Sequence, residues 1–294
     1  MRKIFVCYII SFFAFNTAYA QEKLTNFVDP FIGTGGHGHT FPGAVVPFGM
    51  VQLSPDNETQ GWDWCSGYHY SDHKIVGFSH THLSGTGIGD WLDISVMPLS
   101  FPLKGQDTIF KSATFSHQNE RAVPGYYAVK LDNGIQVELT TSERVGYHRY
   151  TYPAGTEPTI RFDLAFHKNW DTPTETYIKK VNDTTLVGYR YSTGWASTQR
   201  VYFAAIASKP FAEFHLKGEL DIQAGDISIG LESKEKGKGV SSQLIFSPTD
   251  SPETSELKVA LSMTSYDKAL LALNEIPHWN FNEVKAQADA KWER

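Results

Sequence analysis

Short runs in which apolar and polar residues alternate fill the middle of the chain, and they restrict its possible folds most. Residues 127–131 and 135–139 each alternate with a period of two, and Asn133-Gly134 separates them. Asn-Gly between two such runs is a strong signal for a β-hairpin. Further strands are predicted at residues 159–166, 176–181, 185–191, 200–207, 226–232, 242–246 and 257–263. Many short strands with polar turns predict a mainly β protein, and we assign residues 25–264 to one large antiparallel β-sandwich.

The spacing of the apolar residues changes after residue 264, from every second residue to every third or fourth residue. Residues 266–273 predict a short helix, and Asn280 predicts the N-cap of a second helix, with Glu283 as its capping-box partner. Apolar residues then follow at spacings of three and four, which predicts one helix face: Phe281, Val284, Ala288 and Trp292. No stop signal precedes Arg294. We therefore expect residues 265–294 to be linker helices that lead to a further domain outside this sequence.

The first twenty residues have the pattern of a cleavable export signal. Arg2 and Lys3 precede a mostly apolar run at residues 4–15, and Ala18-Tyr19-Ala20 supplies the small-x-small pattern before Gln21. The run is too short to span a membrane, which takes about 20 apolar residues. No cysteine stands at the cut, which argues against a lipid anchor. We expect residues 1–20 to be a signal peptide and the mature chain to be exported, either periplasmic or secreted.

The charge of the chain argues against two classes of partner. Cleavage before Gln21 lowers the 26 basic residues to 24 against 32 acidic ones, a formal charge of −8. Proteins that bind nucleic acid normally carry a basic excess, and so do proteins held at membranes by charge. We therefore expect no nucleic acid and no membrane among the partners.

Residues 26–100 are unusual in composition. Twelve of the 24 glycines lie between Gly33 and Gly89, and six of the 11 histidines lie within residues 37–82. Glycine at this density indicates backbone with positive φ or close approach to another group. Ordered loops of this kind are often functional, so we place the candidate site here.

Two His-x-His pairs, at residues 37–39 and 80–82, leave two interpretations open. On a strand the two imidazoles of each pair share a face and could bind zinc. The pattern is weak, because the chain has no His-Glu-x-x-His motif and Cys65 is the only cysteine of the mature chain. Structural or sugar-contacting histidines are the favoured interpretation, since a neutral imidazole offers one donor and one acceptor to hydroxyl groups.

Aromatic residues gather in the same zone, at Trp62, Trp64, Trp91, Tyr68 and Tyr70. One tryptophan alone is more often part of a core. A cluster in glycine-rich loops favours a sugar-binding surface, because an indole face packs on the C–H face of a pyranose while its N–H takes a polar partner.

No pair of acids identifies itself as catalytic. Glycoside hydrolysis needs two carboxyl groups, and Asp63 and Asp90 lie in the right zone without a spacing that singles them out. The chain also lacks the Gly-x-Ser-x-Gly motif of serine hydrolases and the phosphate-binding loop of nucleotide-binding proteins. We assign no catalytic residue.

Several long motifs together resemble one family. Phe31–Ala44, Pro47–Asp56, Trp62–Ile75 and Gly77–Asp90 read FIGTGGHGHTFPGA, PFGMVQLSPD, WDWCSGYHYSDHKI and GFSHTHLSGTGIGD. They resemble the N-terminal domain of glycoside hydrolase family 92, the exo-acting α-mannosidases. The run IPHWNFNEVKAQADAKW, from Ile276 to Trp292, is similar to the linker that follows that domain.

The resemblance implies an activity that composition does not. The family joins a β-sandwich through linker helices to an (α/α)6 barrel, with the pocket at their junction. It hydrolyses terminal α-mannosides of glycans and glycoproteins with inversion, and it requires calcium. The general acid, the general base and most calcium ligands lie in the barrel. The resemblance therefore implies no acid, base or metal ligand within this chain.

What the resemblance places in this chain is the wall of the sugar pocket. The expected contact residues are Gly35, Gly36, His37, His39, Phe41, Trp62, Asp63, Trp64, Tyr68, His80 and His82. The first hypothesis is accordingly a pocket domain that is inactive alone and works with a C-terminal (α/α)6 domain on mannose-containing glycans. A stand-alone carbohydrate-binding sandwich and a metal-dependent hydrolase built on the His-x-His pairs remain as alternatives.

Overall fold

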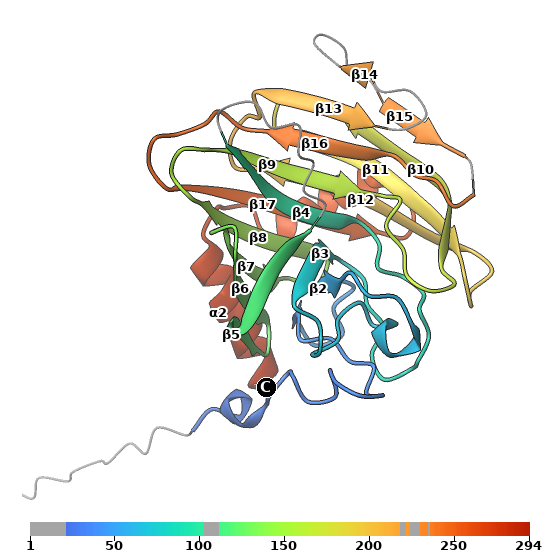
Figure 1. Cartoon of the computed structure of the whole chain (residues 1–294), viewed down its shortest axis with the longest axis vertical. Coiled ribbons are helices and arrows are strands. Elements are labelled where there is room, and N and C mark those ends of the chain that lie inside the picture. The colour runs from blue at the N-terminus through green and yellow to red at the C-terminus, as the bar shows by residue number, and fades with distance from the viewer. Residues whose placement is uncertain (1–21, 103–111, 218–221, 224–229, 235) are drawn as a thin grey trace, which may run out of the picture.

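The computed structural model describes residues 22–102, 112–217, 222–223, 230–234 and 236–294. The expected signal peptide lies outside these residues. Among them, no helix is both long enough and apolar enough to cross a membrane. Two antiparallel sheets face each other, and two short helices cover the outer face of one of them (Figure 1).

The first sheet carries the glycine-rich zone. Its strands, in spatial order, are β2 (Gln52–Asn57), β3 (Lys74–Ser79), β4 (Ser95–Pro102), β9 (Thr156–Asp163), β16 (Ser241–Ile245), β13 (Glu213–Lys217) and β14 (Ile222–Gln223). The short strand β1 (Ala44–Val45) pairs with β2. The zone thus supplies strands as well as loops.

The second sheet is built mostly from hairpins. Its strands, in spatial order, are β5 (Ala113–Val123), β6 (Tyr126–Leu131), β7 (Gln136–Thr141), β8 (Val145–Tyr152), β17 (Glu253–Ser262), β12 (Gln199–Ala207), β11 (Thr185–Thr193), β10 (Thr172–Lys180) and β15 (Gly230–Ser233). The first residues of β5 also pair with β3, so β5 joins the two sheets.

The period of two predicted this sheet well. The Asn133-Gly134 hairpin joins β6 to β7, and Gly134 has a φ of 89°, which glycine adopts without strain. The strand expected at residues 159–166 begins at Thr156 and ends at Asp163. Of the strand expected at residues 226–232, the first part lies outside the described residues and the rest belongs to β15.

The core lies between the two sheets. Phe162 of β9 stacks on Phe203 of β12, with ring centroids 5.8 Å apart. Aliphatic residues from both inner faces surround this pair and are fully buried: Val96, Ile160, Val137, Val259 and Leu261. The alternating side chains of each strand therefore point into one shared interior, as the sequence pattern predicts.

Both predicted helices are present. Helix α1 (Tyr266–Ala272) continues as a 3-10 turn at Leu273–Glu275, and α2 spans Phe281–Trp292. The side chain of Asn280 accepts a hydrogen bond from the Glu283 backbone N–H and so caps α2 as expected. The Glu283 carboxylate meets the Asn280 side-chain amide rather than its backbone N–H.

Helix α2 packs on the second sheet through its predicted face. Phe281, Val284 and Ala288 are buried, and Phe281 lies 5.1 Å from the Tyr147 ring. Trp292 is half-exposed and donates its indole N–H to the Val45 carbonyl. The end of α2 therefore lies against β1, close to the start of the glycine-rich zone.

Candidate functional site

The glycine-rich loops gather at one end of the sandwich, beside β2 and β3 (Figure 1). The first of them, residues 33–41, closes on itself, since the Thr40 N–H donates to the Gly33 carbonyl. A Cβ on Gly38 would lie 2.0 Å from that carbonyl oxygen, so only glycine fits there. His69 donates from Nε2 to the Gly36 carbonyl and ties this loop to the next one.

Four predicted residues form a compact cluster at the surface and directly beneath it, where His39 is buried. His37 Nδ1 lies 2.5 Å from Asp63 Oδ1, and His39 Nε2 lies 3.6 Å from the same oxygen. Trp62 meets the His39 ring edge to face, with centroids 4.2 Å apart, and the His37 ring at 5.5 Å. We call these residues, His37, His39, Trp62 and Asp63, the surface cluster.

The surface cluster is partly open to solvent. Trp62 is 54% exposed although its indole N–H donates to the Gly87 carbonyl. The hydrogen bond from His37 lowers the pKa of Asp63 below its usual value. Asp63 is therefore ionised at neutral pH, and its oxygens can accept hydrogen bonds from hydroxyl groups.

Three predicted residues lie in the interior instead. Tyr68 is buried in the core and donates its hydroxyl to Glu120. His80 is buried and faces the Ile94 carbonyl with Nδ1 and His148 with Nε2. His82 faces Asp56 and the Gln52 carbonyl. These three side chains have almost no exposed surface and bind other residues of the protein in this structure.

The remaining predicted residues lie between these extremes. Gly35 and Gly36 are exposed at the tip of the first loop. Phe41 packs against the His82 ring at 5.1 Å, and Trp64 packs against His69 at 4.7 Å. The indole N–H of Trp64 is buried and has no partner within the described residues. The structure thus brings six predicted residues together near the surface: Gly36, His37, His39, Trp62, Asp63 and Trp64.

The buried pair of Asp56 and His82 fixes how closely the loop that contains Gly67 approaches β2. Asp56 on β2 accepts from His82 Nε2 at 3.0 Å and from the Ser79 N–H. A Cβ on Gly67, whose φ is 85°, would lie 2.4 Å from the Asp56 carboxylate and 2.9 Å from His82 Nε2. The loop that carries Trp62 and Asp63 can therefore approach β2 only with glycine at position 67.

Sequence reasoning missed a second group of residues, contributed by loops far along the chain. The Gly61 N–H donates to Asn169 Oδ1, and the Lys168 ammonium donates to the Thr59 carbonyl. Burial lowers the pKa of Lys168 to about 8. These residues lie about a hundred positions from the loop that they hold, so no local pattern could have marked them.

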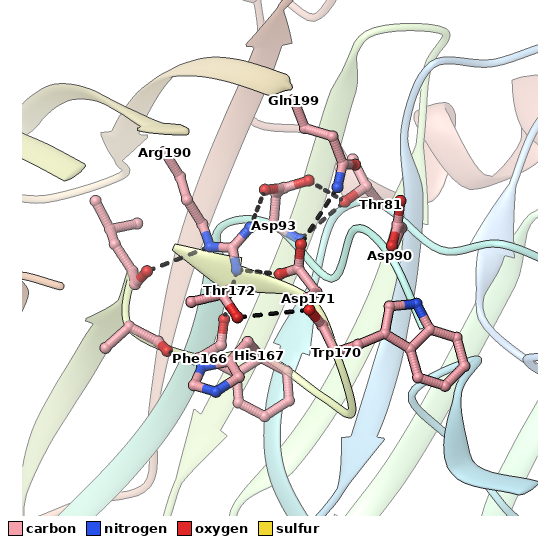
Figure 2. Close-up of polar contacts among 12 residues, drawn as sticks. Thr81, Asp90, Asp93, Phe166, His167, Trp170, Asp171, Thr172, Arg190 and Gln199 are labelled. Carbon is pink, nitrogen blue, oxygen red and sulfur yellow. Dashed lines mark hydrogen bonds and ion pairs between the residues drawn. The ribbon is translucent and has the colours of Figure 1, made fainter. Parts of the chain in front are cut away.

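A buried ion cluster stands behind this second group. The Arg190 guanidinium donates to Asp93 Oδ1 at 2.6 Å, to Asp171, and to the carbonyls of Leu164 and Phe166 (Figure 2). Burial raises the pKa of Asp171 above its usual value, and the positive charge of Arg190 offsets part of that rise. Arg190 therefore ties β11 to the loop after β9, to the start of β10 and to the segment before β4.

Residues 27–262 match the model of the glycosyl hydrolase family 92 N-terminal domain. The chain belongs to glycosyl hydrolase family 92. The motif runs that carry the resemblance lie on the loops and strands of the site just described.

Solved structures show the same family 92 architecture. The α-mannosidase BT3965 of Bacteroides thetaiotaomicron is 34% identical, with a TM-score of 0.83, over 92% of this chain and 37% of its own. The inverting mannosidase BT2199 of the same organism is 24% identical, with a TM-score of 0.76, over 92% and 36%, and supports the fold. An uncharacterized secreted glycosidase of Arthroderma benhamiae is 28% identical over 94% of this chain and 38% of its own length.

This family 92 domain thus spans between a third and two fifths of the length of these relatives. Within the described residues, no group of three or more His, Cys, Asp or Glu side chains is placed to hold a metal ion. The two His-x-His pairs do not converge, because His80 is bound to His148 and His82 to Asp56. A zinc hydrolase built on these pairs therefore has no support in the geometry.

Proposed function

We propose that this chain forms one wall of the mannose pocket in an exported, inverting exo-α-mannosidase. The surface cluster is the observation that carries the proposal. It offers an indole with more than half of its surface open, beside an ionised carboxylate and an imidazole. That combination suits a pyranose, whose C–H face packs on an aromatic ring while its hydroxyls bond to polar groups.

The cluster binds and orients the sugar in this proposal. The Trp62 indole supports the ring, and Asp63 accepts a hydrogen bond from a sugar hydroxyl at a fixed position, because His37 holds its carboxylate. Gly61 hydrogen-bonds to Asn169, so the backbone next to Trp62 is anchored before any ligand arrives. Such preorganisation matters because a misplaced reactant loses much of the rate that orientation supplies.

Proton transfer is assigned to another domain. Inversion needs a protonated acid and a separate base about 6.5–9.5 Å apart with water between them. Asp63 is held ionised and is unsuited to be the acid. Asp90 is buried and accepts the backbone N–H groups of Trp195 and Ala196. We propose that the acid and the base belong to an (α/α)6 domain that works with this one.

The expected calcium ion does not fit the residues in hand. No suitable group of acids exists among the described residues, and the buried carboxylates of Asp56 and Asp93 are occupied by His82 and Arg190. The proposal therefore assigns calcium to the partner domain and no step to this chain through it. The signal-like residues 1–20 and the secreted fungal relative support export.

Mannose release tests the division of labour. The chain alone is compared with a product extended past Arg294 through the length that the relatives carry after this domain. We expect release from α-mannobiose only by the extended product, and a Trp62→Ala substitution in it should lower kcat/KM about tenfold or more. Full activity of the short chain would overturn the division.

A stand-alone carbohydrate-binding sandwich is the second candidate, and the exposed indoles favour it. The short chain and the extended product also distinguish the pocket wall from the stand-alone binding module. Equal mannobiose affinity of the short and extended products, with no hydrolysis by either, would support the binding module. Hydrolysis by the extended product alone would support the pocket wall.

A further inference from the structure

Two more indoles stand exposed beside the surface cluster. Trp170 is 44% exposed and Trp195 is 77% exposed. Trp170 lies in the loop between β9 and β10, and Trp195 lies in the loop between β11 and β12. Neither indole has a hydrogen bond or a ring contact to another described residue.

The loops under these indoles are held firmly. Asp90 accepts the backbone N–H of Trp195 and that of Ala196, each at 2.8 Å. Asp171, next to Trp170, is bound by Arg190 and by the Gln199 amide. Figure 2 shows the Trp170 indole turned away from the Arg190 guanidinium. Both indoles are therefore exposed on anchored backbone.

The three exposed tryptophans of this end form a continuous series. Gly61, just before Trp62, donates to Asn169, just before Trp170, at 3.0 Å. A Cβ on Gly194, just before Trp195, would lie 3.4 Å from the Cα of Asp171, just after Trp170. The residue before Trp62 therefore contacts the residue before Trp170, and the residue before Trp195 lies close to the residue after Trp170. We call Trp62, Trp170 and Trp195 the tryptophan arc.

Other exposed tryptophans of the described residues differ from Trp170 and Trp195. Trp279 is 37% exposed, but the Lys258 ammonium lies 3.8 Å from its ring. Trp292 is 38% exposed, but its N–H donates to the Val45 carbonyl. Of the exposed tryptophans among the described residues, only Trp170 and Trp195 have no partner for either the ring or the indole N–H.

We propose that Trp170 and Trp195 form a distal subsite for further sugar residues of an α-mannan chain whose terminal mannose lies on Trp62. The inference rests on the proposed function. A saccharide is the favoured occupant because the arc offers polar groups with the rings. The two indole N–H groups have no partner among the described residues, and the side-chain Nδ2 of Asn169, which precedes Trp170 in the chain, is buried without a partner. Apolar rings combined with free donors suit a hydroxyl-rich ligand.

Asp90 and Asp171 act as positioning residues in this proposal. Asp90 accepts the backbone N–H of Trp195, and Asp171, which follows Trp170 in the chain, is bound by Arg190, so the indole rings are left to meet the ligand. The distal subsite distinguishes long chains from short ones. A monosaccharide reaches Trp62 alone, whereas an oligosaccharide also reaches the other two indoles and binds more tightly.

Fluorine NMR of the full chain labelled with 5-fluorotryptophan tests the subsite directly. The seven tryptophans give separate signals, and Trp62→Phe, Trp170→Phe and Trp195→Phe assign three of them. The probes are methyl α-mannoside and linear α-mannotetraose at millimolar concentration. We expect methyl α-mannoside to shift the Trp62 signal alone and mannotetraose to shift all three.

Affinity supplies the second measurement. The double variant Trp170→Ala/Trp195→Ala should weaken mannotetraose binding about tenfold, which corresponds to about 1.4 kcal/mol, and leave methyl α-mannoside unchanged. Trp279→Phe is the matched control, because Trp279 is about as exposed as Trp170 but is already covered by Lys258. It should change neither affinity.

The outcomes separate this inference from the proposed function. If Trp62 shifts with both sugars while Trp170 and Trp195 do not, and the double variant keeps its affinity, the distal subsite is wrong and the pocket wall stands. If Trp170 and Trp195 shift with mannotetraose while Trp62 stays silent, the subsite stands and the pocket wall is wrong. Silence of all three indoles contradicts both.

Discussion

Glycine at position 67 is the residue on which the candidate loops most depend. Its φ of 85° and the closeness of Asp56 and His82 both exclude a side chain. Gly36 also has a positive φ, of 58°, but nothing lies within 4 Å of the position that its Cβ would take. An alanine at position 36 would therefore meet backbone strain alone, whereas an alanine at position 67 would meet backbone strain and a steric clash.

This difference predicts unequal effects of alanine. Gly36→Ala should lower the free energy of unfolding by about 1 kcal/mol, the cost of a left-handed alanine. Gly67→Ala should cost about 3 kcal/mol more, because its Cβ would also overlap the buried Asp56 carboxylate and the His82 ring. Urea unfolding of the two variants checks this. Equal losses would mean that the loop relaxes and that Asp56 and His82 do not constrain it.

The buried pair His80 and His148 predicts sensitivity to acid. Their Nε2 atoms lie 2.9 Å apart, and the Tyr150 hydroxyl bonds to His148. Burial lowers the pKa of His80 to about 3 and that of His148 well below the usual 6.5. Below about pH 6.5 these two histidines bind protons in the unfolded chain but stay neutral in the folded chain. The free energy of unfolding therefore falls as the pH drops.

Each of the two imidazoles should lower the free energy of unfolding by about 1.4 kcal/mol as the pH falls from 7.5 to 5.5. His148→Gln removes one of these imidazoles. The free energy of unfolding of this variant should therefore fall by about 1.4 kcal/mol less over this pH range than that of the wild type. His215→Gln is the control, because His215 is partly exposed beside Glu213. It should keep the wild-type pH dependence. An unchanged dependence in His148→Gln would contradict the protonation argument.

Among the elements, the hairpins were predictable and the first sheet was less so. The period of two in β6 and β7 predicted the face that points into the main core, although helix α2 also covers Tyr126 and Ala128 on the other face of β6. Strand β2 is buried on both faces and carries Asp56 and Asn57, whose polar groups bind His82 and the Lys74 carbonyl. A strand buried with polar residues shows no alternation, so its sequence looked like part of a glycine-rich loop.

Helix α2 depends on its N-cap. Asn280 Oδ1 accepts the Glu283 N–H, so Asn280→Ala should lower the free energy of unfolding by about 1 kcal/mol. Asn274→Ala, at an exposed position between the two helices, should have little effect and serves as the control. Urea midpoints of the two variants check this. Equal midpoints would show that tertiary packing of Phe281 and Val284 alone holds the helix.

At the scale of the whole molecule, the sandwich is joined behind the site by Arg190. This side chain is fully buried and links β11 of the second sheet to Asp93, which precedes β4 of the first. Arg190→Gln should lower the free energy of unfolding by about 3–5 kcal/mol, because it leaves two buried carboxylates without a cation. Arg200→Gln, an exposed arginine over the Tyr191 ring, should cost less than about 1 kcal/mol. Equal losses in thermal or urea unfolding would contradict this role.

The candidate site could be predicted only in part. Long local motifs placed His37, His39, Trp62 and Asp63 in one region, and the structure brings these residues together. Trp170 and Trp195 were missed because their neighbours come from tertiary contacts between distant loops. The histidines at positions 80 and 82 share the composition of the site but lie inside, since residue type does not tell a buried imidazole from an exposed one.

Calorimetric titration of the full chain with α-mannobiose tests the central claim most directly. We expect measurable binding by the wild type and by Trp279→Phe, and at least a tenfold weaker affinity for Trp62→Ala. Circular dichroism should show that all three proteins keep the same fold. No binding by the wild type, or an unchanged affinity of Trp62→Ala, would contradict a mannose wall built on the surface cluster.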